Sequence, residues 1–179
     1  MLLDLARMAI ATYIVDKKIP VPNIDEEPLK KKCGVFVSLH KDGDLRGCIG
    51  VFTSDDPLYK TVSLMAVSAA FEDPRFSPVT EEEVKDIDIE ISVLTPLKRI
   101  EDVDEIEIGT HGLYIMKDQN RGVLLPQVAV AQGFDRNLFL DHTCLKAGLK
   151  AGAWREGAEI YTFEADIFDD NMDEEETEA

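Results

Sequence analysis

The spacing of apolar residues predicts two amphipathic helices in the first half of the chain. From Leu2 to Ile14 apolar side chains recur at steps of three and four residues, which is the period of a helix over residues 3–16. A second helix is predicted to follow Thr53 or Ser54, either of which can serve as its cap. Six apolar residues can supply the inner face of that helix: Leu58, Val62, Met65, Ala66, Ala69 and Phe71.

Six shorter stretches are predicted to form strands. Residues 87–93 alternate between apolar and polar side chains, which is typical of a strand with one buried face. Two strand-like runs, 33–40 and 45–52, flank an Asp42-Gly43 pair, and this pair is a strong hairpin signal. The remaining predicted elements are strands over 112–116, 122–125 and 161–167 and a helix over about 136–147. This irregular mixture of strand pairs and helices predicts an α+β fold with mainly antiparallel sheets packed against helices.

The length and composition indicate one globular domain without a membrane segment. The chain has 179 residues, of which 45% are hydrophobic and 31% charged, as in typical globular proteins. Its apolar stretches are much shorter than the ~20 residues that a bilayer-spanning helix needs. Asp4 and Arg7 interrupt the apolar start, so we expect no secretory signal. Three cysteines without paired spacing indicate a reducing compartment, and we therefore expect a cytoplasmic protein.

Acidic residues dominate the charge and exclude one class of partner. The 36 Asp and Glu residues outnumber the 19 Lys and Arg residues, which gives a formal net charge of -17. A field of that sign repels phosphate backbones, so we expect no generic binding of nucleic acid, although a local basic pocket could hold one nucleotide. Many acidic residues lie within 169–179, which we expect to be a disordered tail after a single domain over 1–168.

The strongest candidate for a functional site is the hexapeptide Leu45-Arg46-Gly47-Cys48-Ile49-Gly50. Two glycines so close together weaken a strand, so they indicate a bulge or a place where a ligand or a second backbone comes close. In an extended segment Arg46 and Cys48 project from the same face. A guanidinium beside a thiol stabilises the thiolate that a nucleophilic cysteine needs, and amides next to glycine can hold an anion.

The same hexapeptide also has a purely structural interpretation. A simple hairpin with a four-residue loop would pair Leu39 with Arg46 and Val37 with Cys48, which makes Cys48 an ordinary small residue on a partly apolar face. That register places His40 on the face away from Cys48. His40 is then a poor candidate for the base that activates the thiol, unless a bulge shifts the register.

Five other polar residues are weaker candidates. Asp73 and Arg75 are explained either by a loop ion pair with an Asx turn or by a functional site. Glu90 lies on the polar face of its predicted strand, where it is either a solvated or a functional carboxylate. His111 and Gln127 lie in or beside predicted loops. Neither Cys-x-x-Cys pairs nor a glycine-rich nucleotide motif occurs, so the sequence predicts no metal site and no cofactor.

Together these segments resemble the AMMECR domain family, whose prokaryotic members are also called AmmeMemoRadiSam system protein A. The resemblance covers about residues 2–168. Besides the hexapeptide, the similar blocks follow in family order: 34–39, 69–71, 73–76, 90–94, 111–113, 125–128, 139–140, 146–149 and Trp154. The resemblance implies two subdomains with the hexapeptide in or near a cleft between them. The system name implies association with a Memo-like protein and a radical SAM protein.

Two classes of function stay open at this point. The first is an enzyme or enzyme component that handles a small anionic or nucleotide-like substrate, with Cys48 as nucleophile or acid/base and Arg46 as anion clamp. Glu90 or Asp73 would accept the proton. The candidate ligand-binding residues are Gly47, Gly50, Asp73, Arg75, His111 and Gln127. The second is a non-catalytic adaptor whose glycine-rich hairpin docks a partner protein.

Overall fold

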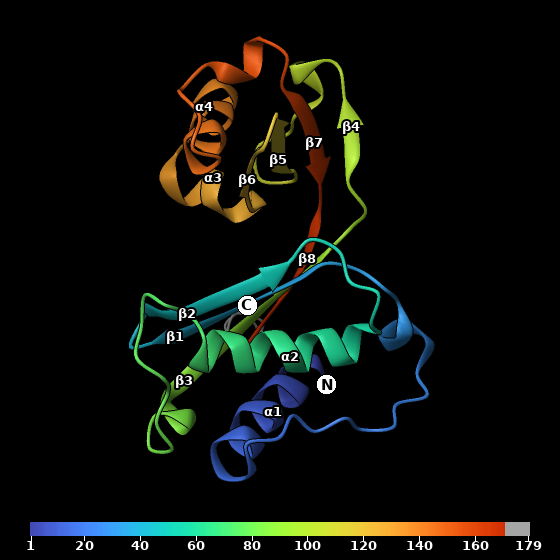
Figure 1. Cartoon of the computed structure of the whole chain (residues 1–179), viewed down its shortest axis with the longest axis vertical. Helices are drawn as coiled ribbons and strands as arrows, with labels where there is room; N and C mark the ends of the chain where they lie inside the picture. Colours follow the sequence, from blue (N-terminus) through green and yellow to red (C-terminus); the bar gives the residue numbers. More distant parts are fainter. Residues whose placement is uncertain (171–179) are drawn as a thin grey trace, which may run out of the picture. The chain divides into compact units, whose positions relative to one another are not determined.

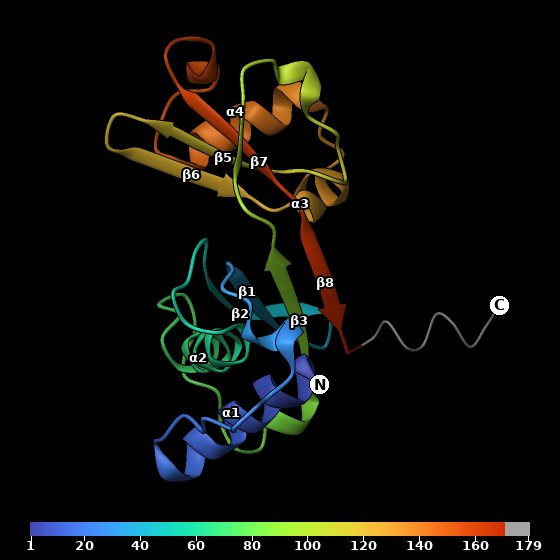
Figure 2. The same ribbon diagram turned by 90° about the vertical axis from the view of Figure 1, so that its right-hand side faces the viewer.

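The computed structural model describes residues 1–170, which form two compact units (Figure 1, Figure 2). Among the described residues, unit 1 consists of residues 1–94 and 166–170, and unit 2 consists of residues 95–165. Each unit contains one four-stranded sheet, with the strand orders β2-β1-β3-β8 and β4-β7-β5-β6. The predicted α+β fold with antiparallel sheets is therefore confirmed.

Unit 1 is a sheet with two helices packed on one of its faces. Its elements are α1 (Leu2–Asp16), β1 (Val35–Lys41), β2 (Asp44–Val51), α2 (Leu58–Phe71), β3 (Ile87–Leu94) and β8 (Ala165–Asp169). Strand β1 pairs antiparallel with both β2 and β3, so β2 and β8 lie at the edges. Both helices lie on the same side of the sheet (Figure 1).

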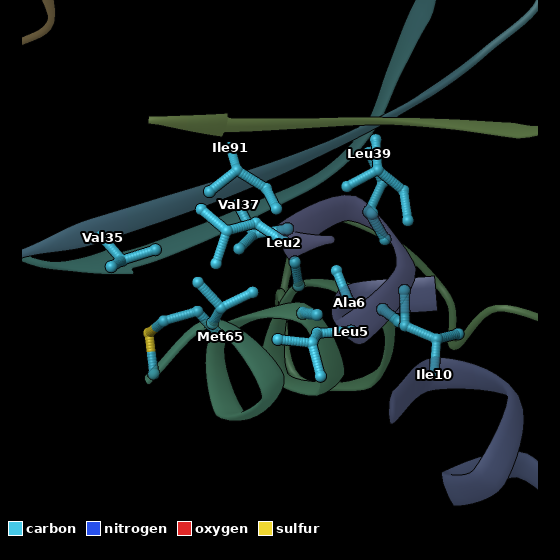
Figure 3. Packing of buried hydrophobic residues seen from close by; sticks show 14 of the residues in the cluster. Leu2, Leu5, Ala6, Ile10, Val35, Val37, Leu39, Met65 and Ile91 are labelled. Carbon is cyan, nitrogen blue, oxygen red and sulfur yellow. The ribbon is translucent and has the colours of Figure 1, made fainter. Parts of the chain in front are cut away.

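The alternation of apolar residues decides which face of this sheet is buried by the helices. Val37 and Leu39 of β1 and Ile91 of β3 have no exposed surface, and they pack against residues of α1 and α2 (Figure 3). The side chains between them project from the other face, because successive residues of a strand alternate. We call this the opposite face, and its residues include Phe36, Ser38, His40, Cys48, Gly50 and Glu90.

Unit 2 has the same kind of layering. Its elements are β4 (Lys98–Ile100), β5 (Gly112–Lys117), β6 (Asn120–Leu124), α3 (Pro126–Gln132), α4 (Arg136–Lys146) and β7 (Glu159–Phe163). Its core joins Leu113 and Ile115 of β5 to Phe139 and Cys144 of α4, all of them fully buried. Within residues 1–170 no helix is long and apolar enough to cross a membrane.

The structure differs from the predicted elements at three places. Helix α3 was not predicted; Pro126, which follows the end of β6, occupies its first turn, where the missing N–H costs nothing. The last predicted strand is two strands of different sheets, β7 and β8, which are separated at Glu164. At the start of α2 the cap position is taken by Pro57, and the Ser54 hydroxyl instead accepts the backbone N–H of Asp56 at 3.1 Å.

The boundary of the predicted tail is also corrected. Asp169 is the last residue of β8, and the Asp170 carboxylate accepts hydrogen bonds from the Arg7 guanidinium at 2.5 Å and from the Ile89 N–H at 2.8 Å. These two residues therefore belong to the folded part of unit 1, because β3 and α1 hold them. The rest of the predicted tail, 171–179, lies outside the described residues.

Candidate functional site

A β-bulge in β2 decides which residues of the hexapeptide share a face. The predicted pairs of Val37 with Cys48 and of Leu39 with Arg46 are wrong, since Cys48 lies opposite Ser38. The register shifts at one position, and Arg46 is the extra residue there. Cys48 therefore lies on the opposite face of the sheet, away from α1 and α2.

The bulge also changes the relation between His40 and Cys48. His40 lies opposite Leu45. His40 is two residues from Ser38 along β1, and Ser38 is the cross-strand partner of Cys48. His40 and Cys48 therefore share the opposite face, which corrects the expectation that they lie on different faces.

Cys48, Ser38 and Glu90 form a row across three adjacent strands. Ser38 is paired with Cys48 on one side and with Glu90 on the other. The Ser38 hydroxyl donates a hydrogen bond to the Cys48 sulfur at 3.2 Å. Ser38 is buried, whereas Cys48 and Glu90 are partly exposed. Because neighbouring strands are about 4.8 Å apart, the Cα atoms of Cys48 and Glu90 are separated by about 10 Å. A small ligand that lies over Ser38 can reach both.

Arg46 is held by the loop that follows α2 and not by the Cys48 row. Its guanidinium makes a two-pronged contact with the Glu83 carboxylate, Nε to Oε1 and Nη2 to Oε2, both at 3.1 Å, and donates to the Ser77 carbonyl at 2.9 Å. The Arg46 contact, together with Thr80 N–H and Lys41, lowers the pKa of Glu83 to about 2. Arg46 thus connects this loop to β2 through an ion pair and hydrogen bonds.

Asp73 and Arg75 cap the outer edge of β2 at Cys48. The Asp73 carboxylate accepts the Cys48 N–H at 2.9 Å, and the Arg75 Nη2 lies 3.5 Å from the Cys48 carbonyl oxygen. Asp73 also accepts the backbone N–H of Arg75 at 3.1 Å and its guanidinium at 2.7 Å, so the ion pair and the Asx turn are both present. The Arg75 guanidinium is the main cause that holds the pKa of Asp73 well below its usual range.

The two glycines of the hexapeptide are in close contact with the chain's own atoms. A Cβ on Gly47 would lie 2.2 Å from the Ala69 carbonyl oxygen of α2, and a Cβ on Gly50 would lie 2.3 Å from the Phe36 ring. Both separations are shorter than van der Waals contact. The glycines predicted that a ligand or a second backbone comes close. In the structure the backbone of α2 lies close to Gly47, and the Phe36 ring lies close to Gly50.

The candidates His111 and Gln127 belong to unit 2. His111 precedes β5, and its Nδ1 accepts the backbone N–H of Glu107 at 3.1 Å. Gln127 is the second residue of α3. All other candidates lie in unit 1, and a ligand-binding role for these two residues stays a prediction.

Sequence reasoning missed two residues that organise the site. The contact between Ser38 and Cys48 was not predicted, because the expected register paired Cys48 with Val37. The bulge shifts the register and places the Ser38 hydroxyl beside the sulfur. Glu83 could be recognised only as the partner of Thr80 in a capping box, and its carboxylate does accept the Thr80 N–H at 3.0 Å. Its ion pair with Arg46 joins positions 37 residues apart, for which the local pattern gave no signal.

No metal centre accompanies the site in the part of the chain that the structure describes. Within residues 1–170 no group of three or more His, Cys, Asp or Glu side chains is arranged to hold a metal ion. The side chains near Cys48 supply a thiol, a hydroxyl, a carboxylate, an imidazole and the guanidinium of Arg75.

Comparisons with known proteins place the whole described chain in one family. The AMMECR1 family model matches residues 3–168. A protein from Methanosarcina acetivorans is 42% identical over 96% of this chain and 91% of its own length. A protein from Methanocaldococcus jannaschii is 44% identical over 92% of this chain and 86% of its own length. The crystal structure of an uncharacterized protein from Pyrococcus horikoshii has a TM-score of 0.88 and 41% identity, and the match covers 94% of this chain and 89% of that one. The chain therefore belongs to the AMMECR1 family.

Proposed function

We propose that this protein is an enzyme, or a component of one, that binds a small anionic or nucleotide-like ligand on the opposite face of unit 1 beside Cys48. The observation that carries the proposal is the hydrogen bond from the Ser38 hydroxyl to the Cys48 sulfur, at 3.2 Å, in a row that ends in the Glu90 carboxylate. This hydrogen bond fixes the position of the sulfur in the row, as a group that reacts with a bound ligand requires. Cys48 acts as nucleophile or acid/base, and Glu90 accepts the proton.

Arg75 is better suited than Arg46 to attract an anionic ligand to this site. The side chain of Arg46 is 14% exposed, and Glu83 and backbone carbonyls occupy its donors. The side chain of Arg75 is 54% exposed, and its guanidinium lies beside the Cys48 carbonyl. We therefore assign the role of binding the anion to Arg75 in place of Arg46, and Asp73 holds the Arg75 guanidinium in position.

The alternative function, a non-catalytic adaptor that docks a partner through its glycine-rich hairpin, receives less support. Gly47 and Gly50 already pack against the same chain, and Asp73 caps the edge of β2 at Cys48.

For the enzyme component, the family likeness supports a Memo-like protein and a radical SAM protein as partners. Size-exclusion chromatography of this chain mixed with purified Memo-like and radical SAM proteins tests that association, and separate elution of all three would contradict it.

Competitive alkylation of the three cysteines tests the proposed site. Burial raises the pKa of the Cys33 and Cys144 thiols, so little of either is thiolate near neutral pH. We expect iodoacetamide to modify Cys48 first in the folded protein, as read by peptide mass mapping. Removing the donor in Ser38→Ala should slow the reaction of Cys48 by about threefold to tenfold, because the sulfur loses the hydrogen bond that holds it in place.

A matched serine variant separates this effect from a general change in the fold. The Ser54 hydroxyl lies at the start of α2 and bonds Thr61 at 2.8 Å, so Ser54→Ala should leave the Cys48 rate unchanged. If Cys48 reacts no faster than Cys144, or if Ser38→Ala and Ser54→Ala have the same effect, the proposed site is wrong.

A further inference from the structure

A pocket within unit 2 combines two guanidinium groups with the single tryptophan of the chain. It has a volume of about 370 Å³, and Arg99 of β4, Trp154, Arg155 and Glu159 of β7 contribute to its lining. Pockets that hold small molecules typically start at about this size. The pocket shares no residue with the Cys48 site, so an inference about it does not depend on the proposed function.

The wall of the pocket that holds Trp154 is fixed by a carboxylate of α4. The Asp141 side chain accepts the indole N–H of Trp154 and the backbone N–H of Gly152, both at 2.7 Å. The Arg155 guanidinium lies 4.0 Å from the centroid of the indole ring, and its Nη1 lies 3.8 Å from the Asp141 carboxylate. The indole and the guanidinium are thus positioned before any ligand binds, which lowers the entropic cost of binding.

Both arginines can still donate hydrogen bonds to a ligand. Their side chains are 59% exposed in Arg99 and 52% exposed in Arg155. The contact of Arg99 with the Glu159 carboxylate is 3.9 Å long, and that carboxylate has a shorter bond, 2.6 Å, with the Tyr161 hydroxyl. Contacts of 3.8–3.9 Å are longer than hydrogen bonds, and each guanidinium has five N–H groups.

We infer that this pocket binds a small phosphorylated polyol, such as a monosaccharide phosphate. Two guanidinium groups suit the oxygens of a phosphoryl group, which arginine can bind through paired N–H donors. The carboxylates of Glu101 and Glu159 also line the pocket, where they accept hydrogen bonds from hydroxyl groups and repel a second anionic group. The volume suits one sugar ring with its phosphate and is too small for a dinucleotide.

Titration with ribose 5-phosphate at constant ionic strength tests the inference. Trp154 is the only tryptophan, so its fluorescence reports on the pocket alone, and calorimetry gives an independent readout of binding. We expect saturable binding with a Kd of about 1 mM or lower, and no binding of ribose without the phosphate. Arg99→Gln and Arg155→Gln should each weaken binding about tenfold or more, because each removes charge-assisted bonds.

Arg121 of β6 provides the matched control. Its guanidinium donates to the backbone carbonyls of Asp118 and Asn120, so Arg121→Gln should change the affinity by less than about twofold. Absence of saturation at about 10 mM ribose 5-phosphate in both readouts would overturn the inference. An affinity that is unchanged in Arg99→Gln and Arg155→Gln, or equal binding of succinate, would overturn it as well.

Discussion

At the scale of single residues, the hexapeptide separates into positions that build the fold and one position that offers chemistry. Gly47 and Gly50 pack against α2 and Phe36, and Arg46 fastens the loop after α2 to β2. Cys48 alone presents its side chain to the row on the opposite face. In this hexapeptide, positions with structural roles thus surround the one side chain that we propose to react.

Gly47 should tolerate no side chain. In Gly47→Ala the new Cβ would lie 2.2 Å from the Ala69 carbonyl oxygen, and that backbone atom cannot move without shifting α2. We expect a loss of about 2–3 kcal/mol in the free energy of unfolding, measured by urea denaturation. Gly133→Ala is the control, because its Cβ would meet no atom within 4 Å and only its positive φ adds strain. A loss in Gly47→Ala no larger than in Gly133→Ala would contradict the packing argument.

The Arg46–Glu83 ion pair should make stability depend on pH in the acidic range. The pKa of Glu83 is lowered to about 2 in the folded chain. The ionised carboxylate therefore stabilises the fold fully above the ordinary glutamate pKa, and this stabilisation is lost as the pH falls towards 2. Between pH 6 and pH 3 Glu83→Gln should therefore lose about 2 kcal/mol less stability than the wild type. Glu81→Gln changes an exposed carboxylate in the same turn and should follow the wild type. Parallel curves for wild type and Glu83→Gln would show that the pair is not formed.

At the scale of elements, the hydrogen bonds of Asp170 join α1, β3 and the end of β8. Its carboxylate accepts from Arg7 and from the Ile89 N–H, and Arg7 also donates to the carbonyl of Ile87 at 3.0 Å. Asp170→Ala should lower the free energy of unfolding by about 1–2 kcal/mol, measured by urea denaturation, because it leaves these donors unpaired. Asp166→Ala, at an exposed position of β8, should have almost no effect. Equal stability of the two variants would contradict this role of Asp170.

The elements that the sequence predicted are those with local causes. The turn between β1 and β2 was recognisable because Asp42 and Gly43 both take positive φ angles, 53° and 84°, which this residue pair favours. The alternation of apolar and polar residues along β3 likewise indicates which face of the sheet packs against the helices. Helix α3 was missed because proline ends a hairpin and starts a helix equally well.

The features that the sequence did not predict depend on distant contacts. The bulge at Arg46 is accompanied by an ion pair to Glu83, and the division between β7 and β8 depends on which sheet each strand joins. Near Glu164 the chain returns from unit 2 to unit 1, and the Glu164 N–H donates to the Thr95 hydroxyl at 2.8 Å. The alternation of apolar and polar residues continues unchanged where the chain passes from one sheet to the other. The sequence therefore predicted β7 and β8 as one strand.

At the scale of the whole molecule, unit 2 is inserted into unit 1 between two neighbouring strands. The chain leaves unit 1 after β3 and comes back as β8, which lies next to β3 and runs in the opposite direction (Figure 2). Each unit has its own core, so each can carry its own binding site on one side of its sheet. The Cys48 row in unit 1 and the arginine pocket in unit 2 are the two sites that we propose.

The net charge of the whole molecule should keep generic nucleic acids away. The formal charge of -17 repels the phosphate backbones of DNA and RNA. Fluorescence anisotropy with a labelled duplex at physiological salt should show no saturable binding. Binding at about micromolar Kd that weakens steeply with salt would contradict this expectation.

The central claim is that Cys48 is a reactive group at a site and not a buried core residue. In a chain with Cys33→Ser and Cys144→Ala, Cys48 is the only thiol, and its rate of alkylation can be compared in the folded chain and in urea. We expect the folded chain to react at least as fast, because Cys48 is partly exposed and its sulfur is hydrogen bonded to the Ser38 hydroxyl on the opposite face. A folded rate about a hundredfold lower than the unfolded rate would contradict the account, since it would mean that Cys48 reacts only when the structure opens.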